Sequence, residues 1–390
     1  MTDSQEQSLG AKVYKQSEGR LLSLQDLLEY FHRRGSMRVS DLHLQVGCPP
    51  VYRVDGSLQR LKGDPLDRPA LDAFLGTLLT EAETAAYRQN GSVDLSLITE
   101  VMRYRINCFH DSEGPAIAIR ALDPTVPAVE KIGFANEVWR DIIKRKQGLV
   151  LLTGITGAGK STTIASMIDR IAQTTPCRII TLEDPIEYRL RSQMAVISQR
   201  EVGRDVPSFE RGLRDCLRED PDVIFVGEMR DRESASWTLT AAETGHLVFS
   251  TLHTRDVRGT ITRVLDMFPS GQQDEVASQL SLGLAYVICQ RLIPRRDGKG
   301  RLVAMEILNN VYGVSNLIRT RKLEQLYTLL QTRTKDIPEE RMVTMERSLA
   351  ILVRDGKIDA LEAEKWAGNA SAFLDEMQHV GSEPPQLQQP

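Results

Sequence analysis

The sequence predicts an α/β protein with two domains and a helical C-terminal region. Four short apolar runs lie between residues 149 and 250, and helical stretches separate them. Such runs are typical of strands that are buried on both faces of a largely parallel sheet. Residues 22–120 combine a helix with pairs of strands, whereas residues 310–375 are mostly helical. A chain of 390 residues is long enough for two or three domains, so each pattern can form a core of its own.

The composition argues against several classes of protein. The formal net charge of −4 disfavours a protein held on nucleic acid by bulk positive charge, so no nucleic-acid partner is expected. The five cysteines are scattered and form no C-x-x-C pair, which predicts neither a disulfide framework nor a zinc site. The polar start lacks a signal-peptide pattern, and no stretch approaches the roughly 18 to 20 apolar residues that span a membrane. We therefore expect a cytoplasmic protein without direct membrane insertion, which reaches a membrane only through a partner.

In the first segment, alternation and turn residues predict one helix and several strands. Residues 22–28 have a helical pattern of apolar side chains, and residues 41–46 alternate like a strand. Pro49–Pro50 and Asp55–Gly56 punctuate one pair of strands, and residues 111–114 form the turn of a second pair. The strands of the second pair are predicted at 104–109 and 116–122.

Polar, aperiodic sequence predicts disorder at both ends of the chain. Two prolines and a polar helical segment lie between the two domains, and this pattern favours an interdomain linker. The predicted divisions are a disordered N-terminus (1–20), a first domain (21–122), a linker (123–147), a second domain (148–310), a C-terminal helical region (311–378) and a disordered tail (379–390).

A glycine-rich loop follows the first of the four apolar runs. Residues 154–161 read GITGAGKS and satisfy the pattern G-x-x-x-x-G-K-[ST] in full. Glycines let backbone N–H groups turn inward around phosphates, and the helix that follows directs its positive end at them. Lys160 is expected to reach the β- and γ-phosphates of ATP, and the Ser161 hydroxyl is expected to bind Mg²⁺. The predicted nucleotide-binding residues are Gly154, Thr156, Gly157, Ala158, Gly159, Lys160, Ser161 and Thr162.

Hydrolysis of ATP also needs acidic groups for the metal and the attacking water. Glu228 follows the third apolar run, and Glu183, Asp184 and Glu187 follow the second. The carboxyl ends of parallel strands are where α/β sheets place ligand chemistry. Acidic residues also end strands simply because loops are solvated, but two such strand ends beside a phosphate loop favour a catalytic role.

His246 and His253 bracket the fourth apolar run. A histidine at a strand end is most often an ordinary polar residue, and no third ligand at metal spacing accompanies this pair, so a metal site is not predicted. The functional alternative is a sensor of the γ-phosphate. A multimeric ATPase also needs a cation that a neighbouring domain or subunit supplies to the γ-phosphate, and Arg105 and Arg120 are candidates, although spacing alone does not select them.

In combination, these motifs resemble the secretion-type ATPases of bacterial type IV pili, and most closely the retraction ATPases of the PilT and PilU type. The resemblance covers about residues 22–335. Three of its later blocks look like the family's aspartate box, Walker B region and histidine box. In chain order the blocks are SDLHL (40–44), RYRIN (103–107), the phosphate loop, TLEDPIE (181–187), REDPDVI (218–224) leading to GEMR (227–230), and AAETGH (241–246) continuing to TLHT (251–254).

The resemblance implies a fold, an assembly and a function. It implies a PAS-like N-terminal α/β domain, followed by a RecA-like P-loop ATPase domain, in a homohexamer. ATP hydrolysis would rotate one domain against the other and so drive pilus retraction and twitching motility. The implied partners are an inner-membrane pilus platform protein and a paralogous pilus ATPase. The implied location is the cytoplasmic side of the inner membrane, at the pilus base.

Residue roles follow from the same resemblance. Glu187 would position or activate the attacking water, and Glu228 would act at Mg²⁺ and the nucleophile. The two histidines of the histidine box would sense the nucleotide, and two arginines of the first domain would reach a γ-phosphate across the ring. The implied catalytic residues are therefore Glu187, Glu228, His246, His253, Arg105 and Arg120.

The chain departs from the family pattern in four places. Ile155 and Ala158 stand where the family has proline and serine, changes that leave the phosphate cradle intact. Residues 313–320 read GVSNLIRT and share only N-L-I-R with the A-I-R-N-L-I-R-E motif of the retraction motors. The DGKG insertion at 297–300 and the longer tail are closer to PilU.

Three other functions are compatible with parts of the sequence. A pilus assembly or type II secretion ATPase of the same superfamily usually has a larger N-terminal region and often a four-cysteine zinc element, and neither occurs here. A RecA-like nucleic-acid translocase predicts a basic channel that bears aromatic side chains, yet aromatic residues make up only 5% of the chain. A scaffold that binds ATP without turnover is disfavoured by the acidic residues at two strand ends.

Overall fold

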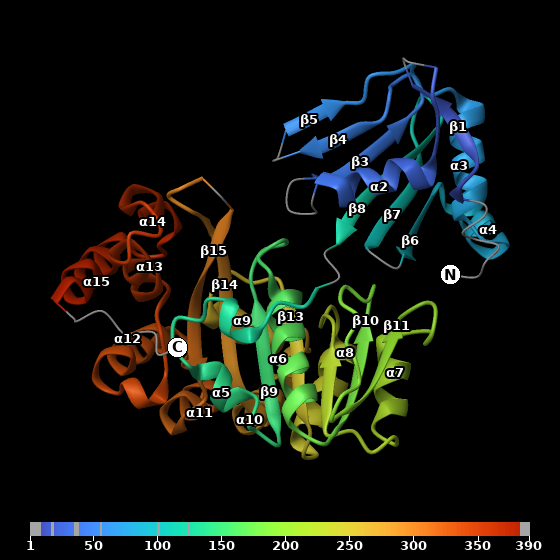
Figure 1. Cartoon of the computed structure of the whole chain (residues 1–390). Coiled ribbons are helices and arrows are strands. Elements are labelled where there is room, and N and C mark those ends of the chain that lie inside the picture. The colour runs from blue at the N-terminus through green and yellow to red at the C-terminus, as the bar shows by residue number, and fades with distance from the viewer. Residues whose placement is uncertain are drawn as a thin grey trace. The chain divides into compact units, whose positions relative to one another are not determined.

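The chain forms two compact units, Met1–Thr125 and Val126–Pro390 (Figure 1). The computed structural model describes residues 9–16, 19–34, 39–54, 57–99, 102–122, 125–298 and 300–382. Helix α5 (Val138–Ile142) lies inside the predicted linker 123–147, but its three apolar side chains are buried in a core of the second unit. The linker prediction is wrong for this helix, because its apolar residues fall on one side and pack against the neighbouring domain instead of facing water.

The first unit is built on a six-stranded antiparallel sheet in the order β5-β4-β3-β8-β7-β6. Alternation places Leu42, Ile106 and Ile119 in one core with Phe31 and Phe74 of helices α2 and α3. The strands predicted at 41–46, 104–109 and 116–122 are confirmed. The elements are α2 (Leu24–Arg34), β3 (Val39–Gln45), β4 (Val51–Val54), β5 (Ser57–Arg60), α3 (Arg68–Leu78), α4 (Glu81–Asn90), β6 (Ser92–Ile98), β7 (Arg103–His110) and β8 (Pro115–Leu122).

Two predictions near the N-terminus are wrong in part. The helix predicted at 22–28 starts later, because β2 (Leu21–Ser23) pairs with β1 (Lys12–Lys15). Strand β1 falls within the predicted disordered segment 1–20, and its Tyr14 is buried in the core of the unit. Tyr14 and the pairing with β2 therefore order a segment whose polar neighbours suggested disorder. Outside the described residues lie 1–8, 17–18 and the predicted turn at 55–56.

The second unit contains a seven-stranded sheet in the order β11-β10-β12-β13-β9-β14-β15. Neighbouring strands are parallel, except that β15 runs antiparallel to β14. The four predicted apolar runs are confirmed as β9 (Gly148–Thr153), β10 (Arg178–Glu183), β12 (Val223–Val226) and β13 (Leu247–Leu252). The sequence did not reveal β11 (Val196–Glu201), β14 (Leu284–Pro294) and β15 (Arg301–Asn309).

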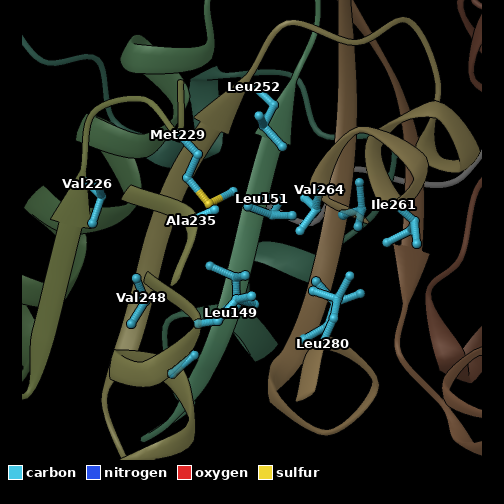
Figure 2. Packing of buried hydrophobic residues seen from close by; sticks show 14 of the residues in the cluster. Leu149, Leu151, Val226, Met229, Ala235, Val248, Leu252, Ile261, Val264 and Leu280 are labelled. Atoms are coloured by element: carbon cyan, nitrogen blue, oxygen red, sulfur yellow. The ribbon is translucent and has the colours of Figure 1, made fainter. Parts of the chain in front are cut away.

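Helices cover both faces of this sheet. Successive residues of a strand point to opposite faces, so β9 contributes Leu149 and Leu151 to one core and Val150 and Leu152 to the other. Figure 2 shows the first of these cores, where Leu149 and Leu151 are surrounded by side chains of α8, α9 and α10. Helix α6 packs on the opposite face. The helices are α6 (Lys160–Thr174), α7 (Phe209–Cys216), α8 (Arg232–Glu243), α9 (Val257–Asp266) and α10 (Gln273–Gly283).

The C-terminal region is helical, as predicted for residues 310–375. A separate small core joins Ile293 of β14 to Leu349 and Phe373. The last helix reaches Ser382, so the disorder predicted for 379–390 is wrong as far as that residue, and 383–390 lie outside the described residues. The helices are α11 (Tyr312–Arg319), α12 (Leu326–Asp336), α13 (Met345–Arg354), α14 (Ala360–Trp366) and α15 (Ala370–Ser382). Over the described part of the chain, no helix combines the length and the apolar character needed to cross a bilayer.

Candidate active site

The phosphate loop joins β9 to α6 at the carboxyl edge of the parallel strands. Gly154 and Gly159 have φ values of 142° and 87°, which L side chains rarely adopt. A Cβ on Gly154 would lie 2.4 Å from the backbone O of Gln290, and a Cβ on Gly159 would lie 2.9 Å from Nε2 of the same residue. Strand β14 therefore packs directly against the loop; Gly154 is required for this close approach, and Gly159 is favoured by its positive φ.

Lys160 begins α6, and it is only 8% exposed. Its ammonium group donates to the carbonyl O of Gly154 at 2.8 Å and lies 3.3 Å from the carbonyl O of Ile155. Burial lowers the pKa of Lys160, while the carboxylates of Glu228 and Glu187 act in the opposite direction. Charged phosphate oxygens are stronger acceptors than carbonyls, so an arriving phosphate can take over the contacts of this ammonium group.

His253 lies between Lys160 and Glu228. Its Nδ1 is 3.4 Å from Nζ of Lys160, and its Nε2 is 3.4 Å from Oε1 of Glu228. Because an ammonium group can only donate, Nδ1 is the acceptor and the neutral ring carries its proton on Nε2, facing the carboxylate. Burial lowers the pKa of His253, and so does the charge of Lys160, while Glu228 opposes them. The three side chains thus form a polar chain in the order cation, neutral imidazole and carboxylate.

Arg230 holds Glu228 from another side. Its Nε donates to Oε2 of Glu228 at 2.8 Å, and its Nη1 donates to Oδ2 of Asp184 at 2.9 Å. The hydrogen bond to Glu228 is the largest cause of the raised pKa of Arg230. The guanidinium thereby links the ends of β10 and β12. Since Arg230 is half exposed, each ion pair stabilises the fold by at most about 1 kcal/mol, so its main effect is to orient the Glu228 carboxylate.

Glu187 follows β10 in a segment that contacts α6. The next residue, Tyr188, places its Oη 2.8 Å from Oγ1 of Thr162. The carboxylate of Glu187 is close enough to influence the pKa of Lys160. Glu183 differs from Glu187, because it is buried and accepts hydrogen bonds from two neighbouring side chains. Of these two acidic residues, Glu187 is therefore the one whose charge acts on Lys160 of the phosphate loop.

A pocket of about 510 Å³ opens beside the loop. This volume lies within the range that is common for ligand sites in proteins. It is lined by Ile155, Thr156, His253, Thr254 and Arg255. The lining thus combines the start of the phosphate loop with the segment that follows β13.

His246 is not part of this site. It precedes β13, whereas His253 follows that strand, and β13 is parallel to β9. Six strand residues separate the two histidines by about 20 Å, so His246 lies at the edge of the sheet opposite the phosphate loop. Its Nδ1 lies 2.9 Å from the carbonyl O of Ala241, at the end of α8. The parallel register therefore separates His246 from the phosphate loop of its own chain, and of the two histidines expected to sense the nucleotide, His253 is the one beside that loop.

Arg105 and Arg120 lie side by side in the first unit, as register partners on β7 and β8. The Nε of Arg120 donates to Oδ1 of Asp41 at 2.8 Å, and Nε of Arg53 lies 3.8 Å from Oδ2 of the same carboxylate. Burial favours protonation of Asp41, but hydrogen bonds from Ser40 and Arg120 outweigh it and lower its pKa. Two arginines, Arg53 and Arg120, therefore flank the Asp41 carboxylate, and Arg105 lies beside Arg120 on the next strand of the sheet.

The structure brings the phosphate loop together with three of the predicted catalytic residues, Glu187, Glu228 and His253. The two arginines belong to the other unit. Sequence reasoning missed several residues that hold these groups in place. The GEMR block contained Arg230 and could have revealed it, whereas nothing in the sequence pointed to Gln290. The missed residues are Asp41, Tyr188, Arg230 and Gln290.

The fold and the site define a P-loop ATPase with an N-terminal α/β domain and a RecA-like second domain. Residues 40–371 match the family described as type II/IV secretion system protein, and the chain belongs to this family. The chain is 41% identical over 327 residues to a twitching motility protein of Neisseria gonorrhoeae. The aligned region covers 84% of this chain and 86% of that protein. It is 40% identical over 347 residues to the type IV pilus retraction ATPase PilT of Pseudomonas aeruginosa. This alignment covers 89% of this chain and 98% of that protein.

A solved structure leads to the same family. The chain is 41% identical to the pilus retraction motor PilT with bound ADP, with a TM-score of 0.80 over 90% of this chain and 99% of that one. The predicted fold class, the family and the ATPase activity are thereby confirmed. The chain is an ATPase and binds a nucleotide.

Proposed function

We propose that this chain is the motor ATPase of type IV pilus retraction, and that it drives twitching motility. The observation that carries the proposal is its similarity, over most of its length, to relatives named for pilus retraction and twitching motility. The arrangement of Lys160, Glu187 and Glu228 around the phosphate loop supports turnover rather than binding alone.

The nucleotide is ATP, and its metal is Mg²⁺. The residues at the site fit this metal, because Ser161 offers a hydroxyl in the first turn of α6 and Glu228 offers a carboxylate. Mg²⁺ prefers such oxygen ligands and keeps waters and substrate phosphates in its remaining positions. Within the described ranges there is no group of three His, Cys, Asp or Glu side chains that could hold a metal alone. A metal with so few protein ligands binds together with the nucleotide, whose phosphates supply further ligands.

Each residue at the site has a distinct task in hydrolysis. Loop N–H groups and Lys160 bind the β- and γ-phosphates, with the positive end of α6 behind them. Glu187 positions or activates the attacking water, and Glu228 acts beside the metal. His253 senses the γ-phosphate, because it contacts both the cation that binds the phosphate and the carboxylate Glu228.

The working assembly is a homohexamer, in which Arg105 and Arg120 of one subunit reach the γ-phosphate of another. The carboxylate of Asp41 supports this role, because it holds the guanidinium of Arg120 by a charge-assisted hydrogen bond. An arginine supplied in this way stabilises the charge of the transition state and makes turnover depend on assembly. The partners are a platform protein of the inner membrane and a paralogous pilus ATPase, and the ring acts in the cytoplasm at the pilus base.

A deletion strain tests the proposal. Retraction predicts that cells without this protein carry excess pili and do not twitch, and that the wild-type gene restores movement whereas a Lys160→Ala gene does not. Bald cells would instead support an assembly ATPase, and normal pili with normal movement would contradict any role in the pilus. The direction of action needs this experiment, because residues 313–320 match the motif of the retraction motors only in part.

A further inference from the structure

Gln290 bridges the phosphate loop and the helix that follows it. The residue is on β14 and is 1% exposed. Its Nε2 donates to the carbonyl O of Ala158 at 2.6 Å, and its Oε1 accepts from Oγ1 of Thr163 at 2.9 Å. Both ends of the side-chain amide are thus engaged within the loop-helix segment.

The partners determine the orientation of this amide. A carbonyl oxygen can only accept, so the atom of Gln290 that faces Ala158 must be the NH₂ group. The reversed amide would place two acceptors 2.6 Å apart in a dry environment, which is strongly unfavourable. The remaining oxygen then faces Thr163, whose hydroxyl can donate. The contact is therefore specific for an amide and would not be made by an apolar side chain of the same size.

Register places Gln290 beside the loop. Strand β14 pairs with β9 as far as Cys289 and Thr153, and Gln290 is the next residue of β14. Its backbone O leaves no room for a Cβ at Gly154, and its Nε2 would lie 2.9 Å from a Cβ at Gly159. Strand β14 thus continues past the end of β9 and supports the outside of the loop.

We propose that Gln290 is a positioning residue of the ATP site, which acts through the peptide bond between Ala158 and Gly159. In a planar trans peptide, the C=O and the N–H point in opposite directions. By holding the carbonyl of Ala158 from the outside, Gln290 directs the N–H of Gly159 toward the phosphates. The bond from Thr163 fixes the first turn of α6 to the same amide. This inference rests on the proposed role of the loop as the nucleotide site.

The substitution Gln290→Glu tests the mechanism through its pH dependence. A protonated glutamic acid can still donate to Ala158, whereas a carboxylate places a negative oxygen against that carbonyl. Burial raises the pKa of such a carboxyl group, so both forms are accessible near neutrality. ADP affinity of the variant, relative to wild type, should therefore recover as the pH falls from about 8.5 to about 5.5. Gln290→Ala should bind ADP roughly three- to ten-fold more weakly than wild type at every pH, which is the effect of losing one or two hydrogen bonds.

The matched control is Asn310→Asp. The Nδ2 of Asn310 also donates to two backbone carbonyls, those of Ser281 and Leu284, which precede or begin β14 and are far from the phosphate loop. The control is expected to change thermal stability without changing ADP affinity. An equal loss of ADP affinity in the control would reduce the role of Gln290 to general stability and overturn the proposal.

Titrations of purified protein with fluorescent ADP separate the possible outcomes. If wild-type protein does not bind ADP, the nucleotide site itself is wrong. If wild type binds ADP but Gln290→Ala binds it equally well, or if Gln290→Glu shows no recovery at low pH, the positioning role is refuted. Should the Gln290 variants fail to fold, Thr163→Val removes the second hydrogen bond and is expected to weaken ADP binding by roughly three-fold. Unchanged binding by that variant would equally contradict the proposal.

Discussion

Replacing Glu306 by glutamine is expected to stabilise the second unit increasingly as the pH rises from 6 to 8. Glu306 is on β15 and is 4% exposed. Its Oε2 accepts the backbone N–H of Val257, the first residue of α9, at 3.0 Å. Burial raises the pKa of Glu306 to about 8, against an ordinary value of 4.5. The neighbouring carboxylates of Asp256 and Glu346 act in the same direction, whereas the hydrogen bond from Val257 opposes the shift.

The sign and size of the effect follow from proton linkage. Between pH 4.5 and about 8 the folded protein keeps the proton of Glu306, while the unfolded chain has lost it. Raising the pH therefore lowers the free energy of unfolding, by up to about 1.4 kcal/mol per unit and by about 2 kcal/mol from pH 6 to pH 8. Glutamine retains an acceptor for Val257 but has no proton to lose. The stability advantage of Glu306→Gln over wild type should thus grow by about 2 kcal/mol over this range.

Urea unfolding at pH 6, 7 and 8, followed by circular dichroism, measures this difference. Glu339→Gln is the control, because Glu339 is exposed and its carboxyl group is in water in both states. A constant difference between Glu306→Gln and wild type at all three pH values would refute the reasoning. A variant less stable than wild type at pH 8 would show that the carboxylate form is favoured in the fold. Either result would mean that Glu306 is ionised where it lies.

The remaining predictions concern catalysis. Lys160→Ala should lower phosphate release at least about 100-fold, because it removes the buried cation at the phosphates. Glu228→Ala should lose hydrolysis but still bind fluorescent ADP, and wild-type turnover in either variant would contradict the site. Arg105→Ala should lower turnover only in the assembled ring. A wild-type monomer that is fully active by itself would argue against a role of Arg105 across subunits. His253→Ala should reduce kcat. His246→Ala should instead lower the free energy of unfolding by roughly 1 kcal/mol and leave kcat unchanged. If both variants lost kcat equally, both histidines would act at the nucleotide.

Local patterns were enough to predict much of the second unit. The strands β9, β10, β12 and β13 are short apolar runs because both of their faces are buried, and burial on both faces is visible in the sequence itself. Strand β14 was not predicted because it follows α10 without a loop, and Gly283 is the one residue at their junction that signals the end of the helix. Strand β1 was not predicted, because only its pairing with β2 and the burial of Tyr14 distinguish it from a polar tail.

The sequence by itself determined the phosphate loop, because the cradle is made of consecutive residues whose backbone must bend at glycines. It also placed Glu187 and Glu228 at strand ends, and parallel strands end at a common edge. The sequence placed His246 and His253 at opposite ends of one predicted strand, but only the tertiary structure showed that His253 contacts Lys160 and Glu228, because that contact needs β13 to lie parallel to β9. Only the structure could find Gln290, which is 132 residues from Ala158 in the chain and reaches it through the pairing of β14 with β9. Contacts of this kind depend on strand register, which no local pattern in a single sequence records.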